Sequence, residues 1–256
     1  MLKKYVFIMI IIMEMDKYFN IYFIFKIYNK MKKVISFSLW GNNPTYNIGA
    51  IKNADQAKII YPEFECWFYI HIDSVPKETI DKLILLDNVK IIYKSGDLSL
   101  IKPMMWRFEA IDDPNVEIMM SRDTDTRIYQ REKLAVGEWL NSNKLFHIMR
   151  DHPHHQFYIL GGMFGTRKIP DISSWLNIIN NYNQNGNRMY DQDFLKDKIY
   201  PHIKDCSIVH ASFHKYEEHS KPFPIDYNDE LNFVGEYVFE DESRSKEHIE
   251  ILKLNI

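Results

Sequence analysis

Two aspartates separated by one residue, Asp123 and Asp125, are the side chains whose types and spacing best suit metal chemistry. They follow an apolar run at 116–120 that has the length and composition of a buried strand, and Arg122 and Arg127 flank them. Side chains at positions i and i+2 of extended backbone point to the same face. Two carboxylates on one face suit a hard divalent cation that also takes phosphate oxygens. The sequence therefore predicts a divalent-metal site at this point.

The spacing alone is weak evidence, because a second pair of this kind occurs at Asp191 and Asp193. The alternative interpretation of the first pair is a solvated turn after a strand, with the flanking arginines as surface counter-charges. The strand in front of the first pair favours a metal site, since ligands of open α/β sheets bind beyond the carboxyl ends of the strands.

The elements that would position these carboxylates alternate along the chain. Strands are predicted at 34–39, 66–72, 89–93 and 116–120, with helices between them at 48–61, 77–86 and 102–111. Ser74 is expected to cap the second of these helices. The alternation predicts parallel βαβ units in a doubly wound sheet. Later in the chain we expect helices at 131–140 and 192–199, an amphipathic element at 172–182, a short strand at 146–149 and an apolar element ending at 208–210.

The composition is that of a globular protein. A chain of 256 residues with 46% hydrophobic and 26% charged residues is long enough for one α/β domain of ordinary size. The formal net charge of −3 argues against a surface that coats nucleic acid. The sequence contains no glycine-rich phosphate loop, so phosphate chemistry would have to use a metal and basic side chains. The two cysteines, Cys66 and Cys206, are expected to be buried thiols rather than a disulfide or a zinc site.

A single domain at 31–240 is the simplest organisation, with an apolar extension at 1–30 and a charged, peripheral tail at 241–256. Charges at Glu14, Asp16 and Lys17 interrupt the extension, so it does not match the long apolar stretch of a transmembrane helix. It is interpreted as an interfacial or signal-anchor helix, as an extra helix on the domain, or as upstream sequence before a true start at Met31. The third interpretation is favoured. We therefore expect a cytoplasmic protein with weak or no membrane association, the alternative being association through residues 1–30.

The order of these features resembles nucleotide-sugar-dependent glycosyltransferases of the GT-A fold, especially those arranged like the glycogenin family, over about 31–240. The segment S-F-S-L-W, which contains Ser38 and ends at Trp40, resembles the strand and turn that hold the base and ribose. Lys102 and Arg107 stand on the helix before the metal strand, where the family places basic residues that bind the donor phosphates.

The later part of the resemblance covers four segments. S-R-D-T-D-T-R at 121–127 resembles the D-x-D signature of the family. Gly161 and Gly162 lie in a segment similar to the one that borders the donor sugar, and Asp191 begins a segment similar to the D-Q-x-x-L sequence near the acceptor. His210, followed by Lys-Pro-Phe from Lys221, resembles the late metal-ligand histidine and its Lys-Pro-aromatic partner.

The resemblance implies a GT-A (Rossmann-like) α/β fold, with a mostly parallel mixed sheet flanked by helices in a single domain. It also implies a glycosyltransferase that uses Mn²⁺ or Mg²⁺ and a nucleoside-diphosphate sugar, with a UDP-sugar favoured, and a hydroxyl acceptor on a glycan, a protein or a small molecule. The abundance of Asn, Lys, Ile and Tyr is typical of a viral or other AT-rich source, and a viral source would place the protein in the host cytoplasm.

We expect Asp125 to ligate the metal directly, Asp123 to contact both ribose and metal, and His210 to complete the site when the donor binds. Lys102 and Arg107 would bind phosphate. The alternatives are a strand-end histidine that is hydrogen-bonded to backbone and two charges on a helix surface.

Asp191 is the candidate for acceptor positioning or for the base that takes the proton of the acceptor hydroxyl, and a helix N-cap is the alternative. Asp151, with His152, His154 and His155 in the loop D-H-P-H-H at 151–155, is a second candidate for this base, the alternative being an exposed loop. Gly161 and Gly162 indicate a close backbone approach, either to ligand or to a neighbouring strand.

The sequence departs from the glycogenin pattern in two places. The spacing from His210 to Lys221 is longer, so His214 or His219 could replace His210 as the ligand. The carboxylates lie in R-D-x-D-x-R rather than after apolar residues, which leaves retention or inversion at the anomeric carbon open. A metal-dependent phosphoesterase or nuclease that uses the same carboxylates, and a catalytically inactive sugar-nucleotide-binding module, are the alternative functions.

Overall fold

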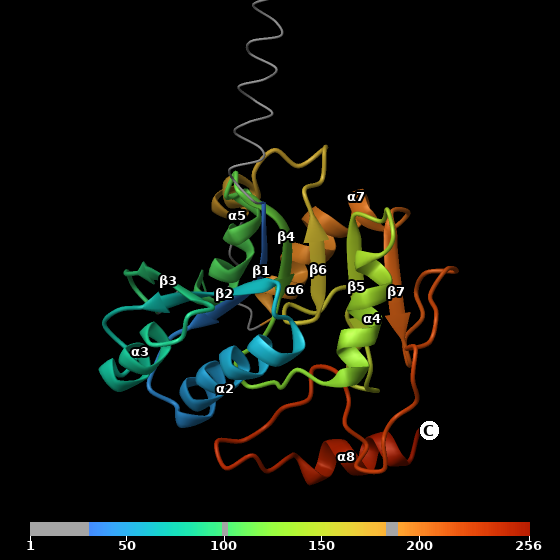
Figure 1. Cartoon of the computed structure of the whole chain (residues 1–256). Helices are drawn as coiled ribbons and strands as arrows, with labels where there is room; N and C mark the ends of the chain where they lie inside the picture. Colours follow the sequence, from blue (N-terminus) through green and yellow to red (C-terminus); the bar gives the residue numbers. More distant parts are fainter. Residues whose placement is uncertain (1–30, 99–101, 183–188) are drawn as a thin grey trace, which may run out of the picture.

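In a computed structural model that describes residues 31–98, 102–182 and 189–256, the chain forms one seven-stranded sheet with helices on both faces (Figure 1). The strand order is β3-β2-β1-β4-β6-β5-β7. The strands are β1 (Lys32–Leu39), β2 (Phe64–His71), β3 (Val89–Lys94), β4 (Val116–Ser121), β5 (Phe146–Arg150), β6 (Phe164–Arg167) and β7 (Ser207–Ala211).

The sheet is mostly parallel. Strand β1 lies between β2 and β4, with Ile35 opposite Cys66 on one side and Met120 on the other, and both pairings are parallel. Strand β6 is antiparallel to both of its neighbours, β4 and β5, while β5 and β7 are again parallel. The predicted α/β fold with a mostly parallel mixed sheet in one domain is confirmed.

Helices cover both faces of the sheet, because the central strands are apolar on both sides. The helical elements are α2 (Pro44–Ile60), α3 (Lys77–Ile84), η1 (Lys102–Asp112), α4 (Gln130–Leu140), α5 (Trp175–Asn181), α6 (Tyr190–Phe194), η2 (Leu195–Ile199), α7 (Tyr200–Ile203) and α8 (Lys246–Lys253). Val34 contributes to a core that includes Phe108 of η1 and Trp175 of α5. The next residue, Ile35, contributes to the core that includes Ala54 of α2 and Trp139 of α4.

Local sequence explains how helix α2 follows β1. The side chain of Asn43 accepts a hydrogen bond from the Thr45 amide at 3.0 Å, and Pro44 occupies the first turn, where a missing N–H costs nothing. Ala50, Ala54 and Ala57 form the buried stripe that lets the helix approach the sheet closely.

One local prediction was wrong. Ser74 does not cap α3, whose N-cap residue is Pro76. The Ser74 hydroxyl instead accepts a hydrogen bond from the Gly41 amide at 2.8 Å and pairs with Nδ1 of His71 at 2.8 Å, so it joins the ends of β1 and β2. The helix expected at 102–111 is present as η1, and it is of the 3₁₀ type.

The segment after β7 returns across the domain and ends in α8 (Figure 1). Residues beyond Glu240 were expected to be peripheral, yet Nη2 of the buried Arg127 lies 2.8 Å from Glu242 Oε1, and Leu252 of α8 is fully buried. Residues 241–256 therefore pack against the domain.

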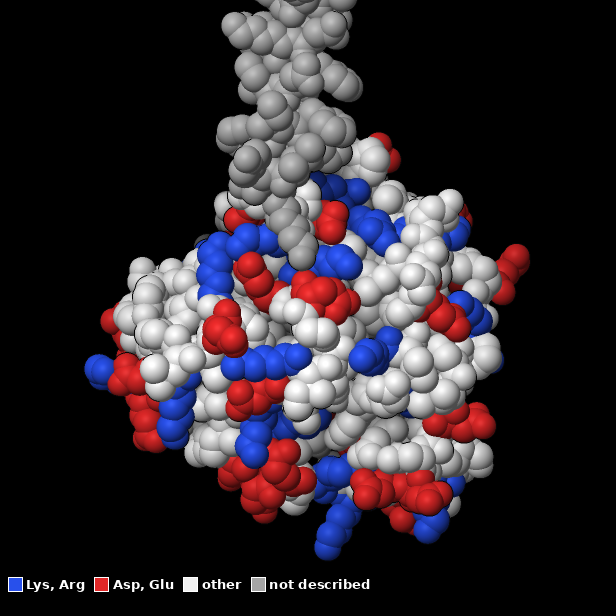
Figure 2. Space-filling view, viewed as in Figure 1, with Lys and Arg blue, Asp and Glu red and all other residues white. Residues whose placement is uncertain are grey.

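Figure 2 shows acidic and basic side chains interspersed over the face in view. The predicted extension at 1–30 lies outside the described residues, and within the described part no helix has the length and apolar character needed to cross a membrane.

Candidate active site

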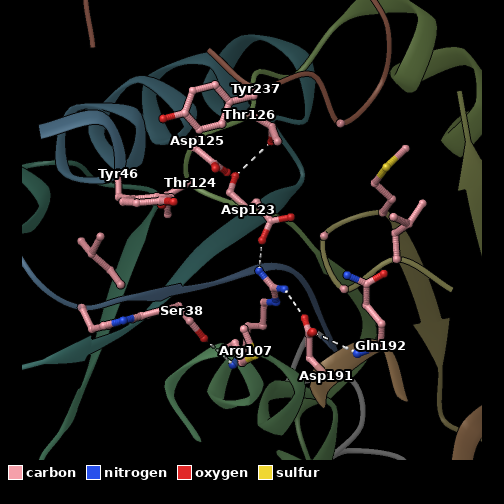
Figure 3. A pocket seen from close by; sticks show the side chains of 18 of the residues that line it. Ser38, Tyr46, Arg107, Asp123, Thr124, Asp125, Thr126, Asp191, Gln192 and Tyr237 are labelled. Carbon is pink, nitrogen blue, oxygen red and sulfur yellow. Dashed lines mark hydrogen bonds and ion pairs between the residues drawn. The ribbon is translucent and has the colours of Figure 1, made fainter. Parts of the chain in front are cut away.

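A cavity of about 750 Å³ opens at the carboxyl ends of β1 and β4 (Figure 3), the edge at which ligands of α/β sheets bind. Its walls come from the turn after β1, the segment after β4, the loop before β6, the start of α6 and the segment after β7. The cavity brings together eight of the residues that the sequence predicted for the site: Ser38, Trp40, Arg107, Asp123, Asp125, Gly161, Gly162 and Asp191.

Asp123 and Asp125 both line this cavity, but they do not lie on extended backbone as predicted. Strand β4 ends at Ser121, and residues 124–125 form a turn in which the Thr126 hydroxyl donates to the Asp123 carbonyl at 3.0 Å. The Asp123 side chain is 41% exposed. The Asp125 carbonyl accepts a hydrogen bond from the Val238 amide at 2.8 Å, so the segment after β7 is attached directly to this turn.

Arg107 connects two of the carboxylates (Figure 3). Its Nη1 donates to Asp123 Oδ1, and its Nη2 donates to Asp191 Oδ2 at 3.1 Å. Its amide donates to Ser38 Oγ at 3.0 Å, which joins η1 to the end of β1. Burial alone would lower the pKa of the Arg107 guanidinium, but the charges of Asp123 and Asp191 raise it above its ordinary value. Arg107 is therefore a permanent positive charge in the cavity wall.

The carboxylates of the cavity have unusual acidities. Burial and the neighbouring charge of Asp123 raise the pKa of Asp125 to about 7, in spite of Arg107 and Arg127. Burial raises the pKa of Asp191 to about 6, with Arg107 acting in the opposite direction. In both residues burial is the larger cause, and the charge of Asp123 adds to it.

These side chains fit a divalent cation. Two neighbouring carboxylates offer hard oxygen ligands, and a bound cation would offset the repulsion that raises the pKa of Asp125. Within the described ranges no cluster of three or more histidine, cysteine, aspartate or glutamate side chains is arranged to hold a metal. The two aspartates alone match the way in which Mg²⁺ and Mn²⁺ bind, through one or two carboxylates, substrate phosphates and water.

Gly161 and Gly162 allow the carboxylates to approach the chain closely. A Cβ atom at Gly161 would lie 2.1 Å from Asp191 Oδ2, and one at Gly162 would lie 1.9 Å from Asp123 Oδ2. The Ser121 hydroxyl donates to the Gly161 carbonyl at 2.6 Å and holds the loop against the end of β4. The two glycines thus make room for the carboxylates of Asp191 and Asp123. The sequence had predicted a close approach to a ligand or to a neighbouring strand, and not to these side chains.

His210 is not placed to complete a metal site with Asp123 and Asp125. It is fully buried in β7, where Nδ1 lies 2.8 Å from His147 Nε2 and Nε2 lies 3.1 Å from Glu138 Oε2. Burial lowers its pKa to about 4, with the charge of Lys221 contributing. Both ring nitrogens are therefore engaged by side chains that do not line the cavity.

The alternative ligands and the late lysine also lie outside the cavity lining. Nε2 of His214 lies 2.6 Å from the Pro153 carbonyl, and His219 pairs with Ser207. Lys221 donates to Glu138, so it is not placed to contact a donor in the cavity. The side chain of Lys102 lies outside the described residues.

Asp151 and His154 are likewise separate from the cavity, whereas His155 of the same loop lines it. Asp151 is fully buried, and its two oxygens each lie 2.8 Å from a nitrogen of Arg131. His154 is exposed. Asp191, by contrast, lies within α6 rather than at its N-cap, which is Met189, and its Oδ1 accepts a hydrogen bond from the Gln192 amide at 2.9 Å.

Tyr46 and Tyr237 are among the cavity residues that were missed as individual site residues. His155, which also lines the cavity, was one of the candidates in the histidine-rich loop, where its residue type was a signal. Tyr46 and Tyr237 carry no such signal, because aromatic residues are frequent throughout this chain.

No family model matches the chain, and no curated protein matches it significantly. Among solved structures, a glycosyltransferase involved in the glycosylation of the major capsid of PBCV-1 is similar at 14% identity and a TM-score of 0.46, with 70% of this chain and 81% of that chain covered. The 4-diphosphocytidyl-2C-methyl-D-erythritol synthase from Anaerococcus prevotii DSM 20548 is similar at 14% identity and a TM-score of 0.41, with 75% and 94% covered. Both TM-scores are below 0.5, so neither similarity indicates what this chain does.

Proposed function

We propose that this chain is a metal-dependent glycosyltransferase that moves a sugar from a nucleoside-diphosphate sugar, with UDP as the favoured nucleotide, to a hydroxyl acceptor. The observation that carries the proposal is the meeting of Asp123, Asp125, Arg107 and Asp191 in one cavity. A departing diphosphate needs positive charge and an acceptor hydroxyl needs a base. Groups suited to both tasks lie side by side here.

The diphosphate would bind at the Asp123 end of the cavity. Mn²⁺ or Mg²⁺ held by Asp123 and Asp125 would offset the negative charge that develops on the leaving diphosphate. Arg107 adds a fixed positive charge beside the same carboxylate, and its burial strengthens that charge's effect on a ligand in the cavity.

Asp191 is suited to accept the proton of the acceptor hydroxyl. A base with a pKa of about 6 is mostly ionised at neutral pH and still basic enough to take a proton. Arg107 holds one carboxylate oxygen, and the Gln192 amide holds the other, so the carboxylate keeps one orientation. A buried acid with this pKa in a cavity also favours a catalyst over an inactive binding module.

A metal-dependent phosphoesterase or nuclease is the second candidate, since it would use the same pair of carboxylates. Two-metal hydrolases need more acidic ligands around one point than a donor-binding site does. The described residues contain no group of three that is placed to ligate a metal, which favours sugar transfer.

A thermal-shift experiment with Mn²⁺ and a panel of nucleoside diphosphates tests the proposal. A nucleotide present at 100 times its dissociation constant should add about 2.7 kcal/mol to the free energy of unfolding. We expect the shift to require both UDP and Mn²⁺ and to be absent in Asp125→Asn. No shift with UDP or GDP in the presence of Mn²⁺ would contradict the proposal, and metal-dependent cleavage of phosphodiesters without donor binding would support the hydrolase.

A further inference from the structure

His155 is a polar side chain of the cavity wall that the roles above leave unused. The residue is 8% exposed and lines the cavity with Leu160, Gly162 and Met163. Gly162 packs against the Asp123 carboxylate, so His155 shares a wall with the proposed metal end of the site. The neighbours of His155 determine which of its ring nitrogens donates a hydrogen bond and which accepts one.

One hydrogen bond determines which ring nitrogen of His155 carries the hydrogen. Its Nδ1 lies 3.0 Å from the backbone nitrogen of Asp151. A backbone N–H can only donate, so Nδ1 presents its lone pair and a neutral ring carries its hydrogen on Nε2. Burial, with four neighbouring histidines contributing, holds the pKa of His155 well below its usual range, which keeps the ring neutral.

The Asp151 amide that sets this arrangement is itself firmly held. The Asp151 carboxylate accepts hydrogen bonds from Arg131 at 2.8 Å and from the Val234 amide at 2.9 Å. The His155 amide donates to the His152 carbonyl at 2.9 Å, which closes the loop as a turn. The side chain of Asp151, which the sequence suggested as a catalytic base, thus anchors the loop that carries His155.

We propose that the Nε2–H group of His155 donates a hydrogen bond to a hydroxyl oxygen of the donor sugar; this inference rests on the proposed function. Within the described part of the chain, no hydrogen-bond partner is assigned to Nε2. Leu160 and Met163 make this part of the wall apolar, which suits a neutral oxygen. The diphosphate would have its charged partners at Arg107 and at the cation held by the aspartate pair. In this tautomer His155 is a donor and not the catalytic base.

Calorimetric titration of the full chain in Mn²⁺ separates the sugar contact from the nucleotide contacts. The probes are two matched pairs, UDP with UDP-glucose and GDP with GDP-mannose. His155→Asn keeps an acceptor for the Asp151 amide but has no atom at the Nε2 position. His155→Gln places an amide N–H₂ close to that position. His202→Asn, at an exposed histidine of α7, is the matched control.

We expect His155→Asn to weaken binding of the sugar nucleotide by about three- to tenfold, the effect of one neutral hydrogen bond, and to leave nucleotide affinity unchanged. His155→Gln should recover most of the loss, and His202→Asn should match the wild type. Equal loss for nucleotide and sugar nucleotide, or no loss for either, would overturn the inference. If the wild type binds neither pair, the proposed function and this inference both fail; if it binds them and only the His155 effect is missing, the proposed function stands.

A second measurement does not depend on the folding of any variant. Long-range ¹H–¹⁵N spectra of the histidine rings distinguish the two neutral tautomers and the imidazolium ion. We expect His155 to be the Nε2–H tautomer at neutral pH. A hydrogen on Nδ1, or on both nitrogens, would overturn the inference.

Discussion

Nη2 of Arg107 lies 3.1 Å from Oδ2 of Asp191, and both side chains are 6% exposed. The same guanidinium donates to Asp123, so one buried cation joins the proposed metal end of the cavity to the proposed base. Arg107 lowers the pKa of Asp191 against the larger effect of burial. The charge balance of the site therefore depends on this arginine.

Asp191→Asn should reduce sugar transfer by a factor of about 10² to 10⁴, the usual contribution of a general base, and should leave UDP–Mn²⁺ affinity nearly unchanged. In the wild type the rate should fall as the pH drops below the Asp191 pKa of about 6, because a protonated carboxyl cannot accept a proton. Release of UDP measured across a range of pH checks both expectations. A variant that retains its activity would exclude Asp191 as the base.

Arg107→Met should destabilise the protein by about 3 kcal/mol, because it leaves buried Asp191 without its partner. Urea unfolding measures this, with Lys82→Met as control, since Lys82 forms an exposed pair with Glu78 on α3. Loss of the arginine should also raise the pKa of Asp191 and move the acid limb of the rate profile to higher pH. An unmoved limb would show that the limb does not report Asp191.

Asp125→Asn should make the metal-free protein more stable than the wild type at alkaline pH. Burial and the charge of Asp123 raise the folded-state pKa of Asp125 to about 7, so the folded state binds a proton that the unfolded state has released. The stability of the wild type therefore falls as pH rises from the ordinary aspartate pKa to about 7. Melting in EDTA at acidic and alkaline pH tests the sign, and Mn²⁺ should then stabilise only the wild type.

Gly162→Ala should abolish Mn²⁺-dependent nucleotide binding, because its Cβ would lie 1.9 Å from Asp123 Oδ2 and would displace that carboxylate. Gly137→Ala is the matched control: nothing lies within 4 Å of its Cβ, and Gly137 lies inside helix α4. The control should gain about 0.5–1 kcal/mol of stability from helix propensity. Thermal shifts with and without UDP–Mn²⁺ compare the two, and equal binding by both variants would contradict the proposed position of Asp123.

His210→Gln should lower stability without changing Mn²⁺ affinity, because the ring of His210 pairs with Glu138 and His147. Its folded-state pKa is lowered to about 4, so wild-type stability should be lost as pH falls from the ordinary histidine pKa towards 4. Chemical unfolding over this range should show a shallower pH dependence in the variant. A large loss of Mn²⁺ affinity would instead restore His210 as a metal ligand.

The sequence by itself determined the fold class. Apolar runs of strand length alternate with helical patterns, and this local signal predicted β1 to β4 and the helices between them to within a few residues. It also placed the aspartate pair directly after a strand, which put both residues at the carboxyl edge of the sheet. Local spacing carries this information because backbone geometry decides which way neighbouring side chains point.

Only the tertiary structure decided which distant segments meet at that edge. Strand β4 lies beside β1, and the antiparallel β6 brings the Gly161–Gly162 loop to the same edge. There Asp191 of α6 meets Arg107 of η1. The same strand order carries His210 away from the cavity and brings His155 into it. No spacing along the chain encodes these encounters, because they depend on strand order and on the packing of helices against both faces.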